Sequence, residues 1–322
     1  MALFDWPEEQ LRQYQGVQRE PEDFDEFWGE TLADAARHDL AVERVPVESP
    51  LAQVDVYDVT FAGFGGEPIK AWLRLPAGAT GPLPTVVQYV GYGGGRGHHA
   101  ENLLLASSGF AHLQMDTRGQ GSGWSRGATG DSASPGPQHQ GVMTRGILDP
   151  HGYYYRRFFT DAVRAVDAAK TFPEVEPARL VAWGGSQGGG TALAVAGLRD
   201  DLAALVTFVP FLCDFPRAIR MTDRDPYHEI VRFLAAHRDA VDSVESTLQY
   251  FDGTNFARRG SAPALFSAAL MDSTCPPSTV FAAYNRYAGD KRIKVWPFNG
   301  HEGGSIEDEL AGVHFLRELF GS

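Results

Sequence analysis

Apolar segments alternate with amphipathic segments along most of the chain, and this alternation predicts a layered α/β fold. The short apolar segments have the length and composition of buried strands, and they cover residues 84–91, 111–116, 178–184, 202–210, 263–272 and 292–298. The segments between and after them predict helices at residues 101–110, 153–171, 191–199, 277–288 and 307–320. Because strand–helix repeats join parallel strands, we expect a mostly parallel central sheet with helices on both faces.

The N-terminal part of the chain has a different pattern. Residues 7–38 are charged and favour a helix, in which Phe24, Phe27 and Trp28 form an apolar stripe for packing on the core. Residues 54–63 alternate polar and apolar side chains, and a Gly-Gly pair separates them from a second strand-like segment at 69–76. This pattern predicts a helical extension over about residues 1–40, followed by a hairpin at an edge of the sheet.

Two long segments interrupt the strand–helix alternation. Residues 118–152 are rich in Gly, Ser and Pro, and residues 214–258 are polar and helical between two predicted strands. Long loops of this kind are uncommon in a compact domain and are often functional. We interpret both as insertions over the carboxyl ends of the strands, where open α/β sheets bind ligands. The prediction is therefore one decorated domain over residues 1–322.

Composition narrows the class of protein. The 322 residues are 43% hydrophobic, which supports a large core, and 41 acidic against 28 basic residues give a net charge of −13. The chain has no basic stripe, so nucleic acid is not an expected partner, and neutral substrates are favoured over polyanionic ones. Cys213 and Cys275 lack the spacing of a metal or redox site, so neither a metal nor a cofactor is expected. No secretion signal or membrane-spanning run is visible, which favours a cytoplasmic location without membrane contact.

The most informative motif is Gly184-Gly185-Ser186-Gln187-Gly188, which matches G-x-S-x-G. It follows a predicted buried strand and opens a predicted helix, which is the context of a nucleophile turn. A Walker A phosphate loop would need Lys followed by Ser or Thr, and a dinucleotide-binding loop belongs near the first strand. We therefore predict Ser186 as a nucleophile. The amide of Gln187, at the positive end of the helix, would stabilise an oxyanion.

The general base should follow the serine at a late strand end, and His301 comes directly after the last predicted strand. Two alternatives, His228 and His237, lie in the polar insertion, and a third, His314, lies in the terminal helix. We expect His301 to be the base and its neighbour Glu302 to support the loop.

The residue that orients the base should close the strand before the last one. Asp272 does so, although an aspartate at this position could also cap the following helix. Asp252, in the insertion, and Asp290, near a surface turn, are the alternatives. We expect Asp272 to hold the imidazole in its reactive tautomer.

The loop after an early strand should supply the second oxyanion donor. Residues 89–97 are rich in glycine, which permits close approach of the backbone to a ligand, and Tyr92 is the expected amide donor. Trp124 and Pro226, one in each insertion, are candidates for lining the substrate pocket.

Three spaced motifs carry a family resemblance: Arg118-Gly119-Gln120, the serine motif and His301-Glu302. Together with the segments at 21–28, 146–157 and 270–279, they make the chain similar to the cephalosporin C deacetylase and acetyl xylan esterase group, carbohydrate esterase family seven. The resemblance spans nearly the whole chain. The loop at residues 89–99 departs from the family by having more glycines.

The resemblance implies an α/β-hydrolase fold, with Ser186, Asp272 and His301 as the catalytic triad. It implies that Tyr92 and Gln187 supply the oxyanion amides, and that Arg118, Gln120 and Glu302 brace the loops. It further implies a serine esterase that removes acetyl groups from short acetylated sugars and cephalosporin C. The implied protein is intracellular, uses no cofactor and forms a homo-oligomer, a hexamer.

Two other functions are compatible with the same residues. Another α/β-hydrolase, such as a lipase or a peptidase of the prolyl oligopeptidase type, would use the same triad, although neither a lipase-like apolar lid nor a preceding propeller is visible. A non-catalytic scaffold of the same fold is the other alternative, and the intact Ser, Asp and His set argues against it.

Overall fold

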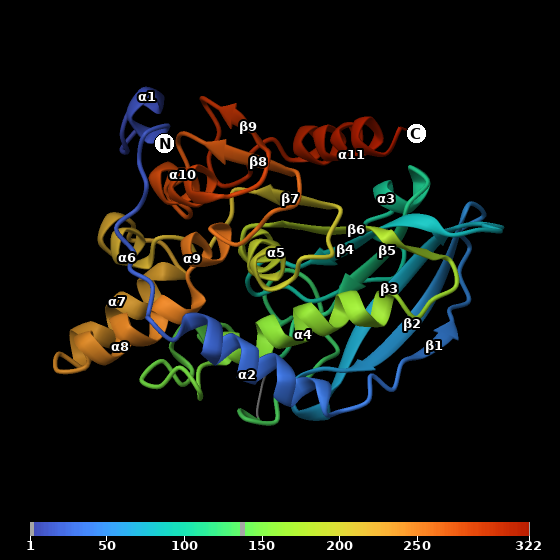
Figure 1. The fold of residues 1–322 in the computed structure, drawn as a ribbon, viewed down its shortest axis with the longest axis horizontal. Coiled ribbons are helices and arrows are strands. Elements are labelled where there is room, and N and C mark those ends of the chain that lie inside the picture. The colour runs from blue at the N-terminus through green and yellow to red at the C-terminus, as the bar shows by residue number, and fades with distance from the viewer. Residues whose placement is uncertain (1–2, 136–138, 322) are drawn as a thin grey trace.

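A nine-stranded mixed sheet forms the centre of the computed structural model, which describes residues 3–135 and 139–321 (Figure 1). The strand order is β1-β2-β3-β5-β4-β6-β7-β8-β9. The six strands from β5 to β9 in this order are parallel, and β1, β2 and β3 pair antiparallel at one end. The strands are β1 (Glu43–Pro46), β2 (Val54–Ala62), β3 (Pro68–Pro76), β4 (Leu83–Tyr89), β5 (Ala111–Met115), β6 (Val175–Gly185), β7 (Ala204–Phe208), β8 (Ala264–Ala269) and β9 (Lys291–Trp296). The predicted α/β fold is confirmed.

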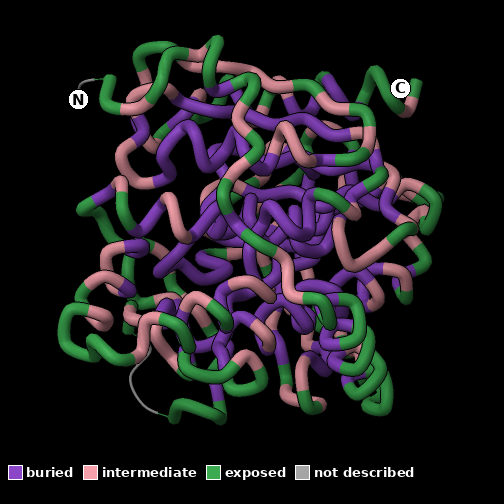
Figure 2. Tube along the Cα trace, turned by 60° about the vertical axis from the view of Figure 1, so that its left-hand side comes forward, coloured by how far each residue is buried: buried purple, intermediate pink, exposed green. Residues whose placement is uncertain are grey.

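Helices cover both faces of this sheet because successive strand residues point to opposite sides. On β4, Val86 packs toward α3 (Leu104–Ser107) and α11 (Ile306–Phe320), whereas Val87 packs toward α4 (Tyr154–Ala169) and α5 (Gln187–Leu198). The second face carries the larger core, which also includes α2 (Phe24–Ala36) and α10 (Pro277–Arg286). Figure 2 shows the buried residues concentrated in the middle of the molecule, under an exposed outer layer.

Three local predictions need correction. Residues 7–38 form two helices, α1 (Glu8–Leu11) and α2, because the chain turns at Gly16, whose φ of +76° is left-handed. The predicted hairpin pairs β2 with β3 through η1 (Phe64–Gly66), but β1, which the pattern did not predict, is the edge strand. The helix predicted at 101–110 is only the four residues of α3, because Asn102 and Gly109 both take positive φ.

The two insertions have the predicted character. Residues 118–152 contain one short 3-10 element, η2 (Val142–Thr144), apart from residues 136–138, which lie outside the described part. Residues 214–258 contain five short helical elements: α6 (Phe215–Met221), α7 (Tyr227–Ala236), α8 (Val241–Leu248), η3 (Gln249–Phe251) and α9 (Gly253–Ala257). Across the described residues, no helix combines the length and the apolar character that crossing a bilayer requires.

Candidate active site

Ser186 occupies a strained turn between a strand and a helix. Strand β6 ends at Gly185 and α5 begins at Gln187, so the chain reverses at Ser186, whose φ is +55° and ψ is −122°. Its amide donates to the carbonyl oxygen of Phe208 at 2.9 Å, and its carbonyl accepts from the amide of Phe211 at 3.0 Å. A non-glycine residue with positive φ costs free energy, and such strain persists where the surroundings fix it.

The three glycines of the motif differ in how much space surrounds them in this turn. A Cβ atom on Gly184 would lie 2.2 Å from the carbonyl carbon of Gly188, and one on Gly188 would lie 2.1 Å from the carbonyl oxygen of Tyr89. A Cβ atom on Gly185 would approach Phe208 no closer than 3.9 Å, an ordinary contact. Backbone packing therefore requires glycine at 184 and 188, and not at 185.

The structure brings Ser186, His301 and Asp272 together from three separate strand ends. His301 Nε2 lies 2.9 Å from Ser186 Oγ, and His301 Nδ1 lies 2.9 Å from Asp272 Oδ2. Asp272 is fully buried, and its other oxygen accepts the amides of Thr274 at 2.8 Å and Cys275 at 2.9 Å. These amides fix the carboxylate, which in turn fixes the imidazole ring toward the serine.

The alternative acids have other environments. Asp252 accepts the amides of Asp214 and Phe215, and burial, together with the Asp214 carboxylate, raises the pKa of Asp252 to about 6. Asp290 is an exposed residue before β9.

The alternative bases lie on helices. His228 is on α7, His237 ends that helix, and His314 is exposed on α11. The structure pairs none of them with Ser186 among the described residues.

Two cavities meet at the serine. The larger, of about 840 Å³, reaches from Ser186 across the polar side chains of Gln88, Asn102 and Gln114 toward α11. The smaller, of about 400 Å³, is lined by Tyr92, Gln140, Asp225, Pro226 and Thr274. The residues that line both are Gly91, Trp124, Ser186 and His301.

The two predicted pocket residues lie on these walls. Trp124, 66% exposed, donates its indole N–H to the carbonyl oxygen of Tyr92 at 2.9 Å and contributes to both cavities. Pro226 is buried and lines the smaller cavity only.

Gln120 joins the loop that holds Tyr92 to the first residue of α5, Gln187. The side-chain oxygen of Gln120 accepts the amide of Gly93 at 2.7 Å, while its nitrogen donates to the Gln187 side-chain oxygen at 2.9 Å. Tyr155 also donates to that oxygen, at 2.9 Å. Because Gln187 is the first residue of α5, its amide lacks an acceptor within the helix.

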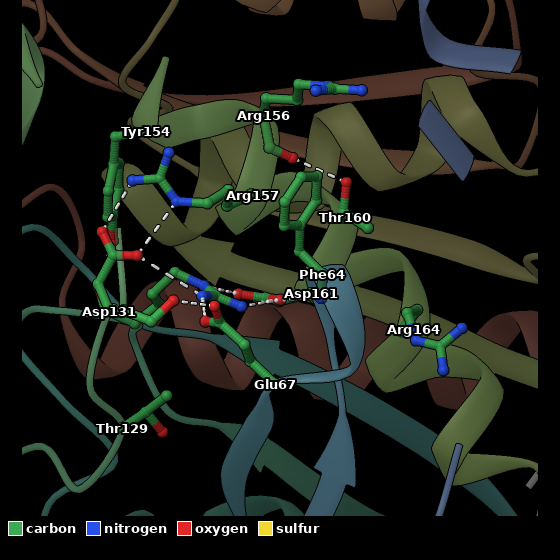
Figure 3. A network of polar contacts seen from close by, with 12 residues as sticks. Phe64, Glu67, Thr129, Asp131, Tyr154, Arg156, Arg157, Thr160, Asp161 and Arg164 are labelled. Carbon is green, nitrogen blue, oxygen red and sulfur yellow. Dashed lines mark hydrogen bonds and ion pairs between the residues drawn. The ribbon is translucent and has the colours of Figure 1, made fainter. Parts of the chain in front are cut away.

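Arg118 does not contact the serine but belongs to a buried ionic network. Figure 3 shows the acidic members of this network, Glu67, Asp131 and Asp161. The guanidinium of Arg118 binds Asp161 through two hydrogen bonds of 2.6 and 2.8 Å, pairs with Glu67 and lies 3.6 Å from Asp131. Arg157 donates two further hydrogen bonds to Asp131, at 3.1 and 2.8 Å. Burial alone would lower the pKa of Arg118, but the carboxylates of Asp161 and Glu67 outweigh it and raise this pKa.

Glu302 braces its own loop. Its carboxylate accepts the amide of Gly300 at 3.1 Å and the side-chain amide of Asn299 at 3.2 Å, and the residue lines the larger cavity. Hydrogen bonds from the backbone amides of Glu302 itself and of Gly300 are the main causes that lower the pKa of Glu302, and the Asn299 side chain adds to them. The carboxylate is exposed and does not bind the serine or its histidine partner directly.

Several polar residues near the site were not predicted. Tyr154 and Tyr155 on α4 bind the side chains of Gln120 and Gln187, respectively, and Glu229 on α7 binds the hydroxyl of Tyr92. None of them belongs to a motif with a known spacing. The only signal in the sequence was the cluster of three tyrosines at 153–155.

One group of side chains has the composition of a metal site. Ligand atoms of Asp272, Cys275 and His301 lie within 4.8 Å of one another. Asp272 and His301 are, however, hydrogen-bonded to each other, and Cys275 is fully buried. A metal ion would therefore have to replace the contact that directs His301 toward Ser186.

Known proteins resemble this chain over nearly its whole length. The family model described as acetyl xylan esterase (AXE1) matches residues 1–319. The solved acetyl xylan esterase from Paenibacillus sp. R4 is 40% identical with a TM-score of 0.91, and the match covers 97% of this chain and 99% of that one. Acetyl xylan esterase 1 from Thermoanaerobacterium sp. JW/SL YS485 is 33% identical with a TM-score of 0.89, over 98% and 100% of the two chains.

More distant relatives differ in length. Acetyl esterase Axe7A from Xylanibacter ruminicola is 25% identical over 88% of this chain, and the chain spans 64% of that protein. A puromycin hydrolase structure, 20% identical with a TM-score of 0.63 over 86% of this chain and 40% of its own, shares the fold.

Proposed function

Because the chain belongs to the acetyl xylan esterase family, we propose that it is a serine esterase that releases acetate from acetylated xylo-oligosaccharides and from cephalosporin C. The observation that carries the proposal is the pair of 2.9 Å contacts through which His301 joins Ser186 to Asp272. Serine hydrolases of unrelated folds use this arrangement to activate the hydroxyl.

In the proposed first step, His301 Nε2 accepts the proton of Ser186 Oγ as the oxygen attacks the acetyl carbonyl carbon. The resulting imidazolium keeps its Nδ1–H on the carboxylate of Asp272, which stabilises the positive charge. The amides of Thr274 and Cys275 hold that carboxylate in place, so little reorganisation accompanies the proton transfer.

The negative oxygen that develops needs donors already in position. We assign this role to the backbone amides of Tyr92 and Gln187, the second of which lies at the positive end of α5. Loss of one such donor in other enzymes costs about 3–4 kcal/mol of transition-state stabilisation. The Gln120 side chain binds both Gly93 and Gln187, and it thereby holds the Tyr92 loop in place relative to the start of α5.

The tetrahedral intermediate then collapses. The bond between the carbonyl carbon and the sugar oxygen breaks, and His301 returns its proton to that oxygen, which leaves an acetyl group on Ser186. Water enters, loses a proton to His301 and attacks the acetyl carbonyl, and acetate leaves as Ser186 recovers its proton. The proposed reaction uses the three side chains of the triad, the two backbone amides and water.

The shape of the site supports a leaving group much larger than the acetyl group. The cavity of about 840 Å³ is lined by the amide side chains of Gln88, Asn102 and Gln114 and by the exposed indole of Trp124. Amides that bond hydroxyl groups and an aromatic face that packs on a ring suit a sugar. We therefore assign the sugar to the larger cavity.

An ester panel on the purified protein tests this function. Acetate release is measured from acetylated xylo-oligosaccharides, cephalosporin C and p-nitrophenyl acetate, and compared with p-nitrophenyl butyrate, longer esters and an aminoacyl amide. We expect turnover of the acetyl esters, a decline with acyl length and no cleavage of the amide. Preferred cleavage of the amide would overturn the assignment in favour of a peptidase.

A fluorophosphonate probe separates an esterase from an inert scaffold. We expect covalent labelling of Ser186, located by mass spectrometry of the digested protein. An unlabelled serine in a folded sample would contradict the esterase assignment.

We also propose that the protein is a homo-hexamer, as its resemblance to carbohydrate esterase family seven implies. Sedimentation equilibrium should give six times the chain mass of 35.1 kDa. A mass of one chain across a concentration series would reject the hexamer.

A further inference from the structure

The hydroxyl of Tyr92 is the centre of a closed hydrogen-bond cluster. Both carboxylate oxygens of Glu229 lie within hydrogen-bond distance of this hydroxyl, at 2.8 and 2.9 Å. The hydroxyl oxygen also accepts the amides of Gly141 at 2.9 Å and Val142 at 3.0 Å. A phenol offers one donor and two acceptor sites, so this cluster uses all of them.

Glu229 connects three segments that are far apart in the sequence. It lies on α7 in the 214–258 insertion, it accepts the hydroxyl of Tyr92 from the loop after β4, and it accepts the amide of Met143 at 3.3 Å from the 118–152 insertion. The carbonyl of Met143 in turn accepts the hydroxyl of Tyr153, the residue that precedes α4. The carboxylate therefore ties the Tyr92 loop to both insertions.

Two other contacts hold the backbone of this loop. The carbonyl of Tyr92 accepts from Trp124, and the amide of Gly93 donates to Gln120. Both Trp124 and Gln120 belong to the 118–152 insertion. The phenol is the one group of Tyr92 that reaches α7, and the chain leading into α7 lines the smaller cavity through Pro226.

We propose that Glu229 is a positioning residue for the oxyanion: by anchoring the phenol of Tyr92, it fixes the position of that residue's backbone amide beside Ser186. The inference rests on the proposed function, because it assumes that the Tyr92 amide stabilises the oxyanion. An amide that acts on the transition state must be held to a fraction of an ångström, and a misplacement of about 1 Å can cost about 100-fold in rate.

The chemical state of the pair suits this role. Burial raises the pKa of the Glu229 carboxyl, and burial followed by the Glu229 charge raises the pKa of the Tyr92 hydroxyl. The tyrosine therefore stays protonated and keeps the proton that it donates. Either form of the carboxyl retains an oxygen that accepts this proton, so the anchor depends on an acceptor at this position more than on its charge.

The experiment therefore compares variants that keep the acceptor at position 229 with variants that remove it. Glu229→Ala removes the acceptor, Glu229→Gln keeps one acceptor oxygen, and Tyr92→Phe removes the hydroxyl while retaining the backbone amide. Steady-state kcat and KM for p-nitrophenyl acetate and the inhibition constant of a phenylboronic acid, which mimics the tetrahedral state, are measured for each. Glu245→Ala, on α8 of the same insertion and paired with Arg220 at the surface, is the matched control.

We expect Glu229→Ala to lower kcat by about 10- to 100-fold with KM changed less than about threefold, since the amide acts in the transition state. Boronic acid affinity should fall in parallel. Tyr92→Phe should reproduce the loss, the double variant should add little to it, and Glu229→Gln should recover most of the activity. Glu245→Ala should match the unaltered protein.

Several outcomes would overturn the inference. They are a kcat for Glu229→Ala within twofold of the unaltered protein, a loss confined to KM, unchanged boronic acid affinity, or effects of the two single variants that multiply in the double variant. If Glu229→Ala does not fold, Tyr92→Phe alone decides, by the same kcat and boronic acid criteria. If the unaltered protein hydrolyses no acetyl ester, the proposed function fails first, and this outcome is distinct from active protein with a neutral Glu229 variant.

Discussion

Two clusters of polar residues, one around Ser186 and one around Arg118, use the same kinds of side chain for different ends. In the serine cluster, His301 bridges a hydroxyl and a buried carboxylate, and both Ser186 and His301 line cavities. In the arginine cluster, the guanidinium meets Asp161, Glu67 and Asp131, and Arg118, Asp161 and Asp131 are buried (Figure 3).

The difference lies in what remains available for bonding. The charges of the arginine cluster satisfy one another, so the cluster joins the β2–β3 turn, the 118–152 insertion and α4 without offering a site. The serine cluster leaves its hydroxyl facing open space. A network in which every charged group already has a partner stabilises the fold. A network that leaves a reactive group facing a cavity can perform chemistry.

Replacing the serine should have the largest effect on activity and should show most clearly that the two clusters have different roles. Ser186→Ala should lower kcat on p-nitrophenyl acetate by about 10⁴-fold or more, because the nucleophile is lost, while the melting temperature changes by only a few degrees. Ser305→Ala is the matched control, since Ser305 has a similar backbone conformation, with φ of +47° and ψ of −125°. Near-normal turnover by Ser186→Ala would reject this residue as the nucleophile.

In the arginine cluster, a substitution should lower stability more than activity. Arg118→Met should lower the free energy of unfolding by about 3–5 kcal/mol, because it leaves buried carboxylates without their cation. Urea denaturation measures this loss, and kcat of the folded fraction should fall far less than in Ser186→Ala. Glu67→Gln is the control: its side chain is 28% exposed, so the cost should be about 1 kcal/mol or less. Equal costs for the two variants would show that burial does not set the strength of this network.

A third pair of variants tests whether the serine turn requires glycine where the backbone packs closely. Gly188→Ala should cost about 1–3 kcal/mol or more, because its Cβ would lie 2.1 Å from the carbonyl oxygen of Tyr89. Gly185→Ala, with 3.9 Å to its nearest neighbour, should cost less than about 1 kcal/mol. Thermal unfolding of both variants checks this order, and a reversed order would contradict the packing described for the turn.

A pH-dependent effect is expected from two buried carboxyl groups, Asp252 and Asp214, of which Asp252 accepts the backbone amide of Asp214. Burial and the Asp214 charge raise the pKa of Asp252 from its ordinary value of 3.8 to about 6. The folded state thus favours neutral Asp252. Its contribution to stability is complete below about pH 4 and is lost as the pH rises through about 6, by up to about 3 kcal/mol.

Urea unfolding between pH 4 and pH 7 measures this decline. Asp214→Asn should make the decline smaller, because it removes the neighbouring charge, even though the variant loses hydrogen bonds at every pH. Asp290→Asn, at an exposed position, is the control. Identical pH dependence in Asp214→Asn and the unaltered protein would contradict the coupling between the two carboxyls.

The sequence predicted the elements with strong local signals. The buried strands at 84–91 and 178–184 and the turn at Ser186 follow from apolar runs and glycine spacing, which act over a few residues. The edge strand β1 has the exposed pattern of a loop, and its pairing with β2 supplies the signal that its own residues lack. Non-local pairing is therefore the physical reason for this omission.

The same distinction applies to the site. Ser186, Asp272 and His301 each lie in the segment that follows a strand, so chain order and strand boundaries predict where they lie, and the structure brings them within hydrogen-bond distance. Glu229 lies in the first turn of α7 and Asp161 in the middle of α4, and they matter because of partners 137 and 43 residues away. No local pattern distinguishes such residues from ordinary charged positions on a helix.

The position of Trp124 separates reactivity from substrate range. Its indole lines both cavities, and its one hydrogen bond goes to the backbone of Tyr92 and not to a reacting atom. A smaller side chain at this position would widen the connection between the two cavities. The variant should then accept ester substrates that are bulky on both sides of the carbonyl carbon. The breadth of accepted esters can thus change in evolution or in the laboratory while the proton relay beneath it stays intact.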